Sequence, residues 1–203
     1  NGDYGERSMN ALNSSLSDFG GNLVSTERYA RGNTSIVSAA QRLRSRGGYD
    51  TVLIADGARL AAQAAGELKS NGADGTRLLG TELWRGQSSI TRSSGLQGAL
   101  FAAVTDQHFK TFSDSYEARF GSKPYRIAAL GFDAVLLTLR VARDWRIGRD
   151  FPTRILREDG GFAGVDGAFR FNRNGIIERA LEVNEIRSDQ IVAVSAAPTS
   201  FSD

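Results

Sequence analysis

Short apolar runs alternate along this chain with longer segments in which apolar residues recur at helical spacing. Thr51–Ala55 is a nearly continuous apolar run, which is typical of a strand buried on both faces. Alanine and leucine then recur at helical spacing from Leu60 to Leu68, and a second apolar run begins at Leu78. The stretch from Asp50 to Trp84 therefore predicts a strand, a helix and a second strand parallel to the first.

Polar residues follow both of these predicted strands. Asp56 comes directly after the first, and Glu82 follows the second, with Trp84 two residues further on. Parallel strands end at the same edge of a sheet, and open α/β sheets bind their ligands at that edge. We therefore expect Asp56 and Glu82 to lie near each other in a candidate binding site.

The other segments extend this α/β pattern and end in a different one. We expect helices at 6–19, 34–46, 106–120, 127–145 and 153–157, and strands at 23–29, 96–104, 168–171, 177–186 and 191–195. The last three strands are predicted to be antiparallel, with Asn174-Gly175 as the turn between the first two. The fold class is therefore α/β, with a doubly wound, mostly parallel sheet and a C-terminal antiparallel strand pair.

The first predicted element is a helix rather than a strand. Asn1–Gly5 resembles a loop that leaves the carboxyl end of a strand, and no such strand stands before it in the sequence. A doubly wound domain does not normally open on a crossover helix. We therefore expect the sequence to be the back part of a longer domain.

Composition narrows the function classes. The net charge of +2 is too small to predict nucleic-acid binding, although the pI is near 9.2. The chain has no cysteine and one histidine, His108, and it contains no Gly-x-Ser-x-Gly elbow. Since no acid–base pair or metal-ligand cluster can be assembled from such a sequence, we expect neither an enzyme nor a cofactor.

Several short motifs resemble a known family when they are taken in order. They are Asp3-Tyr4-Gly5, Tyr49–Ile54, Leu79-Gly80-Thr81-Glu82, Leu96-Gln97-Gly98, Phe120-Gly121 with Pro124, Ala129–Leu137, and Phe171-Asn172-Arg173-Asn174-Gly175. In this order and spacing, the chain resembles the carboxyl-terminal half to two-thirds of a type 1 periplasmic binding protein of the leucine/isoleucine/valine-receptor kind.

The resemblance implies a particular division of the chain. Such proteins have two α/β lobes, and by analogy residues 1–104 form the second lobe, residues 105–159 form a helical part of the first lobe, and residues 160–203 return to the second. The helices at 106–120 and 127–145 would then lack the sheet that should cover them. Their exposed apolar faces would need a companion fragment or a second copy of the chain, in a homodimer.

The resemblance also implies roles for site residues. In amino-acid receptors of this kind, a tyrosine at the position of Tyr4 packs on the ligand side chain, and a glutamate at the position of Glu82 binds the ligand ammonium. An aromatic residue usually follows the first strand, but Asp56 stands there, and it either contacts a different ligand group or caps the next helix. Trp84 either forms a cleft wall or covers the strand end. Tyr4 as a packing residue and Glu82 as a surface partner of an arginine remain open alternatives.

Two functions follow from the resemblance. The first is a solute-binding protein that holds a small polar molecule, such as an amino acid, between two lobes for ABC import or sensing, with a membrane transporter as partner. The alternative is a protein-interaction module similar to penicillin-binding protein activators, whose partner is a peptidoglycan synthase; Leu96–Phe101 resembles that group equally. Both place the protein in the periplasm, and the alternative adds a lipid anchor.

Overall fold

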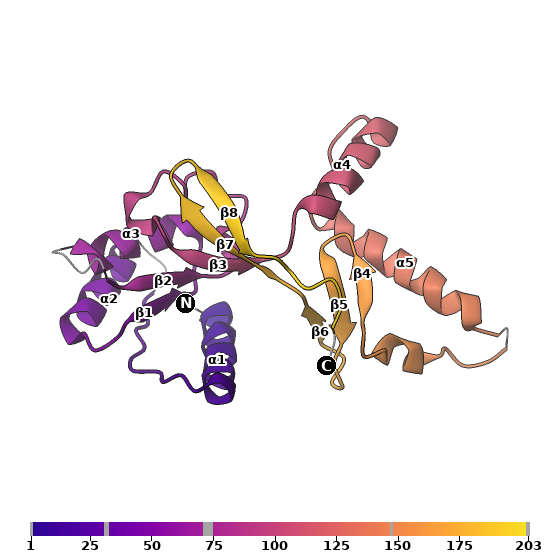
Figure 1. The fold of residues 1–203 in the computed structure, drawn as a ribbon, viewed down its shortest axis with the longest axis horizontal. Helices are drawn as coiled ribbons and strands as arrows, with labels where there is room; N and C mark the ends of the chain where they lie inside the picture. The colour runs from indigo at the N-terminus through magenta and orange to yellow at the C-terminus, as the bar shows by residue number, and fades with distance from the viewer. Residues whose placement is uncertain (1, 31–32, 71–74, 147, 202–203) are drawn as a thin grey trace. The chain divides into compact units, whose positions relative to one another are not determined.

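The computed structural model describes residues 2–30, 33–70, 75–146 and 148–201 (Figure 1). The chain divides into two compact units. Unit 1 comprises Asn1–Ala103 and Val183–Val194, and unit 2 comprises Val104–Glu182 and Ser195–Asp203. Each unit is described by itself.

Unit 1 is an α/β layer. Its helices are α1 (Gly2–Phe19), α2 (Asn33–Arg46) and α3 (Ala58–Leu68), with two short 3-10 turns, η2 (Glu82–Trp84) and η3 (Ser94–Leu96). Its sheet has the order β1 (Thr51–Ile54), β2 (Arg77–Gly80), β3 (Leu100–Ala103), β7 (Glu182–Arg187) and β8 (Gln190–Ser195). The pairs β1–β2 and β2–β3 are parallel, as the apolar runs predict. The predicted fold class, α/β with a mostly parallel sheet, is confirmed.

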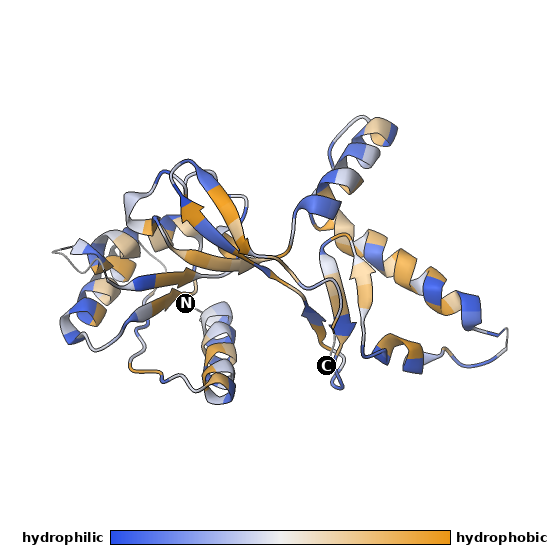
Figure 2. Cartoon of the chain, viewed as in Figure 1, coloured by the Kyte–Doolittle hydropathy of each residue, from blue (hydrophilic) through white to orange (hydrophobic). Residues whose placement is uncertain are grey.

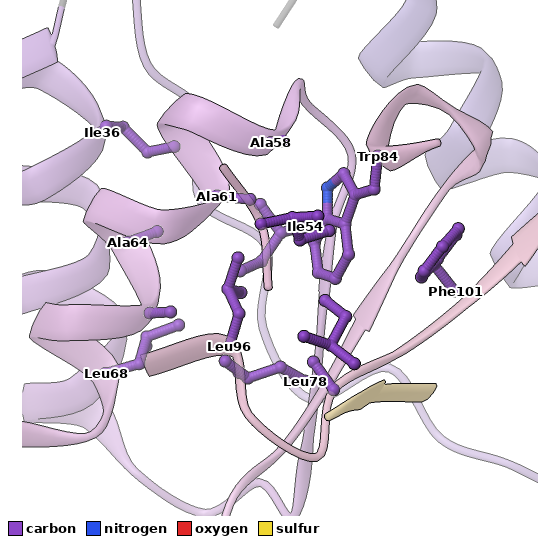
Figure 3. Packing of buried hydrophobic residues seen from close by; sticks show 14 of the residues in the cluster. Ile36, Ile54, Ala58, Ala61, Ala64, Leu68, Leu78, Trp84, Leu96 and Phe101 are labelled. Carbon is purple, nitrogen blue, oxygen red and sulfur yellow. The ribbon is translucent and has the colours of Figure 1, made fainter. Parts of the chain in front are cut away.

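The core of unit 1 lies where α3 packs on the sheet. The small residues Ala61 and Ala65 are completely buried on α3, and Leu68 continues the same helical face. Figure 3 shows this face against Ile54, Leu78 and Leu96. Alanine at these positions lets the neighbouring backbone approach closely: a Cβ at Gly95 would lie 3.1 Å from atoms of Ala65. The high helix propensity of alanine and the burial of these side chains both favour a helix at Ala58–Leu68.

The amino-terminal part of unit 1 differs from the prediction. α1 has the expected amphipathic pattern, yet none of its residues is buried. The strand predicted at 23–29 is wrong, because residues 21–30 have no regular secondary structure and join no sheet of the described residues. Leu23 and Val24 in this segment are 37% and 54% exposed. A strand pattern alone does not produce a strand, since a paired edge must also be within reach.

Unit 2 contains two long helices and a small antiparallel sheet. The elements are α4 (Gln107–Phe120), α5 (Ala128–Asp144), the 3-10 turn η4 (Thr153–Arg157) and a sheet of β4 (Phe162–Gly164), β5 (Gly167–Phe171) and β6 (Ile177–Arg179). The predicted turn between β5 and β6 is confirmed: Gly175 has a φ of 80°, and Phe171 pairs with Ile177.

The single strand predicted at 177–186 is wrong. The chain breaks at Ala180-Leu181 into β6, which pairs with β5, and β7, which joins the sheet of unit 1. Residues 160–182 accordingly belong to unit 2. The three predicted segments, 1–104, 105–159 and 160–203, therefore do not coincide with the two units. Their assignment to lobes stays a prediction.

α5 keeps a large apolar surface exposed. Val135 and Leu139 are 59% and 60% exposed, and Ile127, just before the helix, is 74% exposed. Figure 2 shows hydrophobic and hydrophilic bands alternating along α5. No helix in the described part of the chain is both long and apolar enough to cross a membrane. Whether a sheet or a second chain covers this face of α5 stays a prediction.

Candidate functional site

The two acidic residues predicted at the sheet edge occupy equivalent positions. Ile54 at the end of β1 is paired with Gly80 at the end of β2. Asp56 and Glu82 each follow one of these paired residues by two positions. The register of a parallel pair therefore brings both carboxylates to the carboxyl edge of the sheet, as the sequence predicts.

Tyr4 and Glu82 form one half of this edge. Tyr4 lies in the first turn of α1, and its hydroxyl donates a hydrogen bond of 3.0 Å to Glu82 Oε1. Tyr4 is half-buried and Glu82 is exposed. Burial raises the pKa of Tyr4, and the negative charge of Glu82 raises it further. The phenol therefore remains a hydrogen-bond donor, and it holds an accessible carboxylate at the edge.

Tyr29 and Asp56 form a second hydrogen-bonded pair at this edge of the sheet. The sequence analysis did not identify Tyr29. Its hydroxyl donates to Asp56 Oδ2 at 2.8 Å, while the N–H of Gly57 donates to Asp56 Oδ1 at 2.7 Å. Burial is the main cause that raises the pKa of Tyr29, and the hydrogen bond to Asp56 adds to it. The available signal was its place as the last residue of a predicted strand, which puts it at the same edge.

The hydrogen bond from Gly57 tests whether Asp56 caps the helix that follows it, α3. Gly57 is the N-cap residue of α3, and no side chain caps that helix end. The capping role predicted as the alternative for Asp56 is therefore wrong. Instead, the carboxylate holds the backbone one residue before the cap, with both of its oxygens engaged.

Trp84 lies beneath this edge. Its side chain is completely buried, its Nε1–H donates to the backbone oxygen of Asp56 at 2.9 Å, and its ring lies 6.0 Å from that of Phe101 (Figure 3). The indole fits because Gly80 has no side chain: a Cβ there would lie 2.3 Å from the ring. In this arrangement Trp84 covers the strand end and positions Asp56. A ligand contact by Trp84 stays a prediction that requires the ring to be uncovered.

The chemistry available at the edge is that of two carboxylates and two phenols. Carboxylates with hydrogen-bonded, fixed orientations are suited to binding a cationic group such as an ammonium. Within residues 2–30, 33–70, 75–146 and 148–201, no group of three or more His, Cys, Asp or Glu side chains could hold a metal ion. The two oriented carboxylates make the edge a candidate site for a cationic group.

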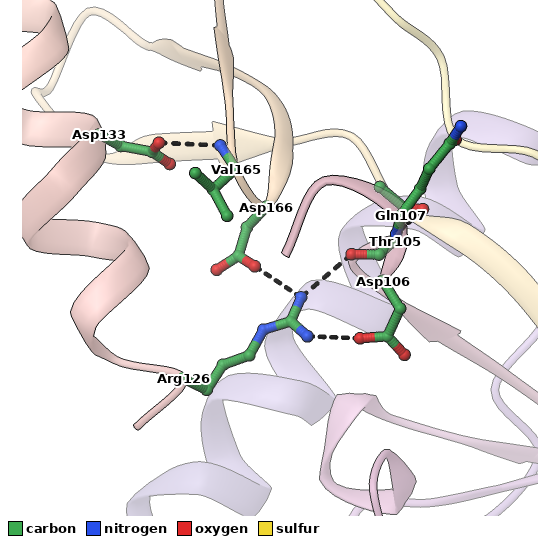
Figure 4. A network of polar contacts seen from close by, with 7 residues as sticks. All are labelled: Thr105, Asp106, Gln107, Arg126, Asp133, Val165 and Asp166. Atoms are coloured by element: carbon green, nitrogen blue, oxygen red, sulfur yellow. Dashed lines mark hydrogen bonds and ion pairs between the residues drawn. The ribbon is translucent and has the colours of Figure 1, made fainter. Parts of the chain in front are cut away.

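A separate polar network orders unit 2 and was not predicted. Arg126 donates to Asp166 Oδ1 at 2.6 Å and to the backbone oxygen of Thr105 at 3.0 Å, and its guanidinium lies 4.1 Å from the ring centroid of Phe109 (Figure 4). Nearby, Asp133 Oδ1 accepts the N–H of Val165 at 2.8 Å. These contacts join the starts of α4 and α5 to the β4–β5 turn.

The comparisons with known proteins agree with this fold. The family model described as periplasmic binding protein matches residues 1–190. The chain therefore belongs to the periplasmic binding protein family, a family of substrate-binding proteins that act in the periplasm. Among curated proteins, the comparison finds no match to this sequence.

Solved structures with this fold include proteins of different roles. A leucine-binding protein from Thermotoga maritima is 19% identical with a TM-score of 0.60, over 96% of this chain and 57% of that one. A solute-binding protein from R. palustris in complex with benzoate is 18% identical with a TM-score of 0.63, over 98% of this chain and 57% of that one. The C-domain of LpoA from Haemophilus influenzae, a regulator of PBP1A, is 16% identical with a TM-score of 0.55, over 82% of this chain and 51% of that one.

These similarities establish the fold and leave the ligand undetermined, because all three identities lie below 20%. The chain also spans only 51–57% of the length of these three structures.

Proposed function

We propose that this chain is part of a periplasmic solute-binding protein that binds a small amino-acid-like molecule for import by a membrane transporter. Glu82 binds the ammonium group of the ligand, Tyr4 contacts its side chain, and Asp56 provides the second negative charge at the same edge. Trp84 and Tyr29 are positioning residues that hold Asp56 in place.

One observation supports the proposal above the others: two carboxylates lie at register-matched ends of neighbouring parallel strands, and a tyrosine orients each one. A hydrogen bond between charged partners is worth about 1.5–3 kcal/mol, more than a neutral pair. Since Glu82 is exposed, it can form such a bond with an incoming cation without prior rearrangement of the core.

The test is a thermal-shift screen of the full-length protein against the twenty amino acids and small amines. A ligand at 100 times its Kd stabilises the protein by roughly 2.7 kcal/mol. The variant Glu82→Gln should weaken the best ligand by about 10-fold to 100-fold, since it removes a charged hydrogen bond worth about 1.5–3 kcal/mol. The matched control is Glu67→Gln, on α3, which should leave the affinity unchanged. Equal affinity in both variants would disprove the role of Glu82.

The second candidate is the protein-interaction module, with a peptidoglycan synthase as partner. One observation favours it: both oxygens of Asp56 are already hydrogen-bonded, and Glu82 already accepts from Tyr4, so the edge is satisfied without a ligand. The same screen separates the two functions. An absence of any shift, together with retention of a purified synthase on the immobilised protein, would replace the first proposal with the second.

A further inference from the structure

The end of α5 and the segment that follows it carry a concentrated positive charge. Residues 143–157 contain five arginines and two aspartates and so have a net charge of +3, whereas the whole chain has +2. All other residues together therefore carry a net charge of −1. The five arginines are exposed and are called the basic patch: Arg143, Arg146, Arg149, Arg154 and Arg157.

The arginines of the basic patch are not neutralised by neighbouring carboxylates. Within the described part of the chain, no carboxylate forms an ion pair with any of the five, whereas Arg140, three residues earlier, pairs with Glu158. The two aspartates of the segment, Asp144 and Asp150, are also exposed. Arginine is almost never fully buried without a partner. The basic patch is therefore a solvent-facing surface, whatever covers the apolar face of α5.

Two exposed aromatic side chains lie within the same segment. Trp145 is 43% exposed and Phe151 is 38% exposed, and their rings meet edge to face with centroids 5.3 Å apart. The indole Nε1–H donates to the backbone oxygen of Arg149 at 2.7 Å. These contacts close the turn between α5 and η4 (Figure 1) and hold both rings among the arginines of the basic patch.

This combination of side chains suits an anionic lipid surface. Clusters of about four to eight basic residues bind anionic headgroups, and indole rings collect where headgroups and acyl chains meet. A nucleic acid is the other common partner of arginine clusters. The family to which the chain belongs acts in the periplasm, a space bounded by membranes, so a lipid surface is the polyanion within reach.

We propose that the basic patch, with Trp145 and Phe151, is a peripheral binding site for an anionic phospholipid membrane. The guanidinium groups bind the headgroup phosphates, and the two aromatic rings enter the boundary between headgroups and acyl chains. The binding is reversible and depends on salt, because exposed charges are screened beyond about 10 Å at 0.1 M ionic strength and beyond about 3 Å at 1 M.

The test is co-sedimentation of the full-length protein, produced without any acyl anchor, with lipid vesicles. Vesicles of phosphatidylcholine alone are compared with vesicles in which about a third of the lipid is phosphatidylglycerol. The triple variant Arg146→Gln, Arg149→Gln, Arg154→Gln removes three charges of the basic patch. The matched control makes the same change at three exposed arginines elsewhere: Arg7→Gln, Arg92→Gln and Arg173→Gln.

The protein should bind the phosphatidylglycerol vesicles and not those of phosphatidylcholine alone. Each arginine near an anionic surface contributes about 5-fold to binding, so the triple variant should bind about 100-fold more weakly. The control should stay within about 3-fold of the unmodified protein. Equal binding to the two kinds of vesicle, or an equal loss in the two triple variants, would overturn the proposal.

A second measurement follows the aromatic side chains. Brominated lipids in the phosphatidylglycerol vesicles should quench tryptophan fluorescence of the unmodified protein, and Trp145→Phe should remove this quenching, since Trp84 is completely buried. Quenching that persists in Trp145→Phe would show that this turn does not enter the membrane and would contradict the proposal. An absence of vesicle binding, with retention on immobilised heparin or DNA, would also overturn it and identify a soluble polyanion as the partner.

Discussion

The contact between Gly80 and Trp84 allows a sharp test of how the sheet edge is built. In the variant Gly80→Ala, the new Cβ would lie 2.3–2.4 Å from three atoms of the indole ring. Carbon atoms pack best at about 3.5–4.0 Å, so the ring would have to move by about 1 Å. It is held in place by its hydrogen bond to the backbone of Asp56 and by Phe101.

The cost can be estimated from these contacts. Overpacking of a buried site costs about 1–3 kcal/mol, and loss of the indole hydrogen bond adds about 0.5–1.5 kcal/mol. Gly80→Ala should therefore reduce the free energy of unfolding by about 2–4 kcal/mol. The matched control is Gly66→Ala on α3, which is exposed with nothing within 4 Å of a new Cβ. It should stabilise the chain by about 0.5–1 kcal/mol, because glycine loses more backbone conformational entropy than alanine when it is fixed in a helix.

Both variants are measured by urea unfolding in a Trp145→Phe background. The chain has two tryptophans, so Trp84 then becomes the sole tryptophan and reports on unit 1. Gly80→Ala is also made in a Trp84→Leu background, in which unfolding is monitored by circular dichroism. There, Gly80→Ala should lower the free energy of unfolding by less than about 1 kcal/mol, since the ring that clashes is absent. If Gly80→Ala changes stability by less than 0.5 kcal/mol, or costs as much without the indole, the packing described for Trp84 is wrong.

Three further predictions follow from the structure. Burial raises the pKa of Tyr29 above its value of 10.0 in the unfolded chain, so the native state keeps this proton after the unfolded state has lost it. The free energy of unfolding should therefore fall as the pH rises above 10. Tyr29→Phe should reduce that fall in unfolding experiments at pH 8–11. Arg126→Lys should lower the free energy of unfolding by about 1–3 kcal/mol in thermal unfolding, because lysine cannot both pair with Asp166 and stack on Phe109. The control Arg143→Lys, at an exposed position of α5, should leave it unchanged. Gly175→Ala should cost about 1 kcal/mol in urea unfolding, since φ at the β5–β6 turn is +80°, and Gly175→Asn should recover part of it.

The sequence predicted the elements whose evidence is local. The apolar run at Thr51–Ala55 gave β1, and helical spacing located α3, α4 and α5 to within a few residues. The position of Asp56 and Glu82 at one edge also followed, since it depends only on two neighbouring parallel strands. The resemblance to periplasmic binding proteins, based on ordered motifs, predicted the family that the comparisons then showed.

The errors concern features that depend on distant partners. An apolar alternation at 23–29 predicts a strand, but these residues pair with no strand within the described structure. The run at 177–186 is continuous in sequence, yet Ala180-Leu181 separates strands that join two different sheets. Tyr29 became visible as a site residue only once its hydroxyl was seen on Asp56, 27 positions away.

The sequence by itself determined the fold class, the family and the sheet edge at which Asp56 and Glu82 stand, because strand and helix patterns arise from neighbouring residues. Only the tertiary structure decided that Trp84 is buried beneath that edge, and that Tyr4 and Tyr29 orient the two carboxylates. These are long-range contacts, and their energies come from burial and pairing between segments far apart in the chain. Local pattern alone holds no information on which of these segments meet.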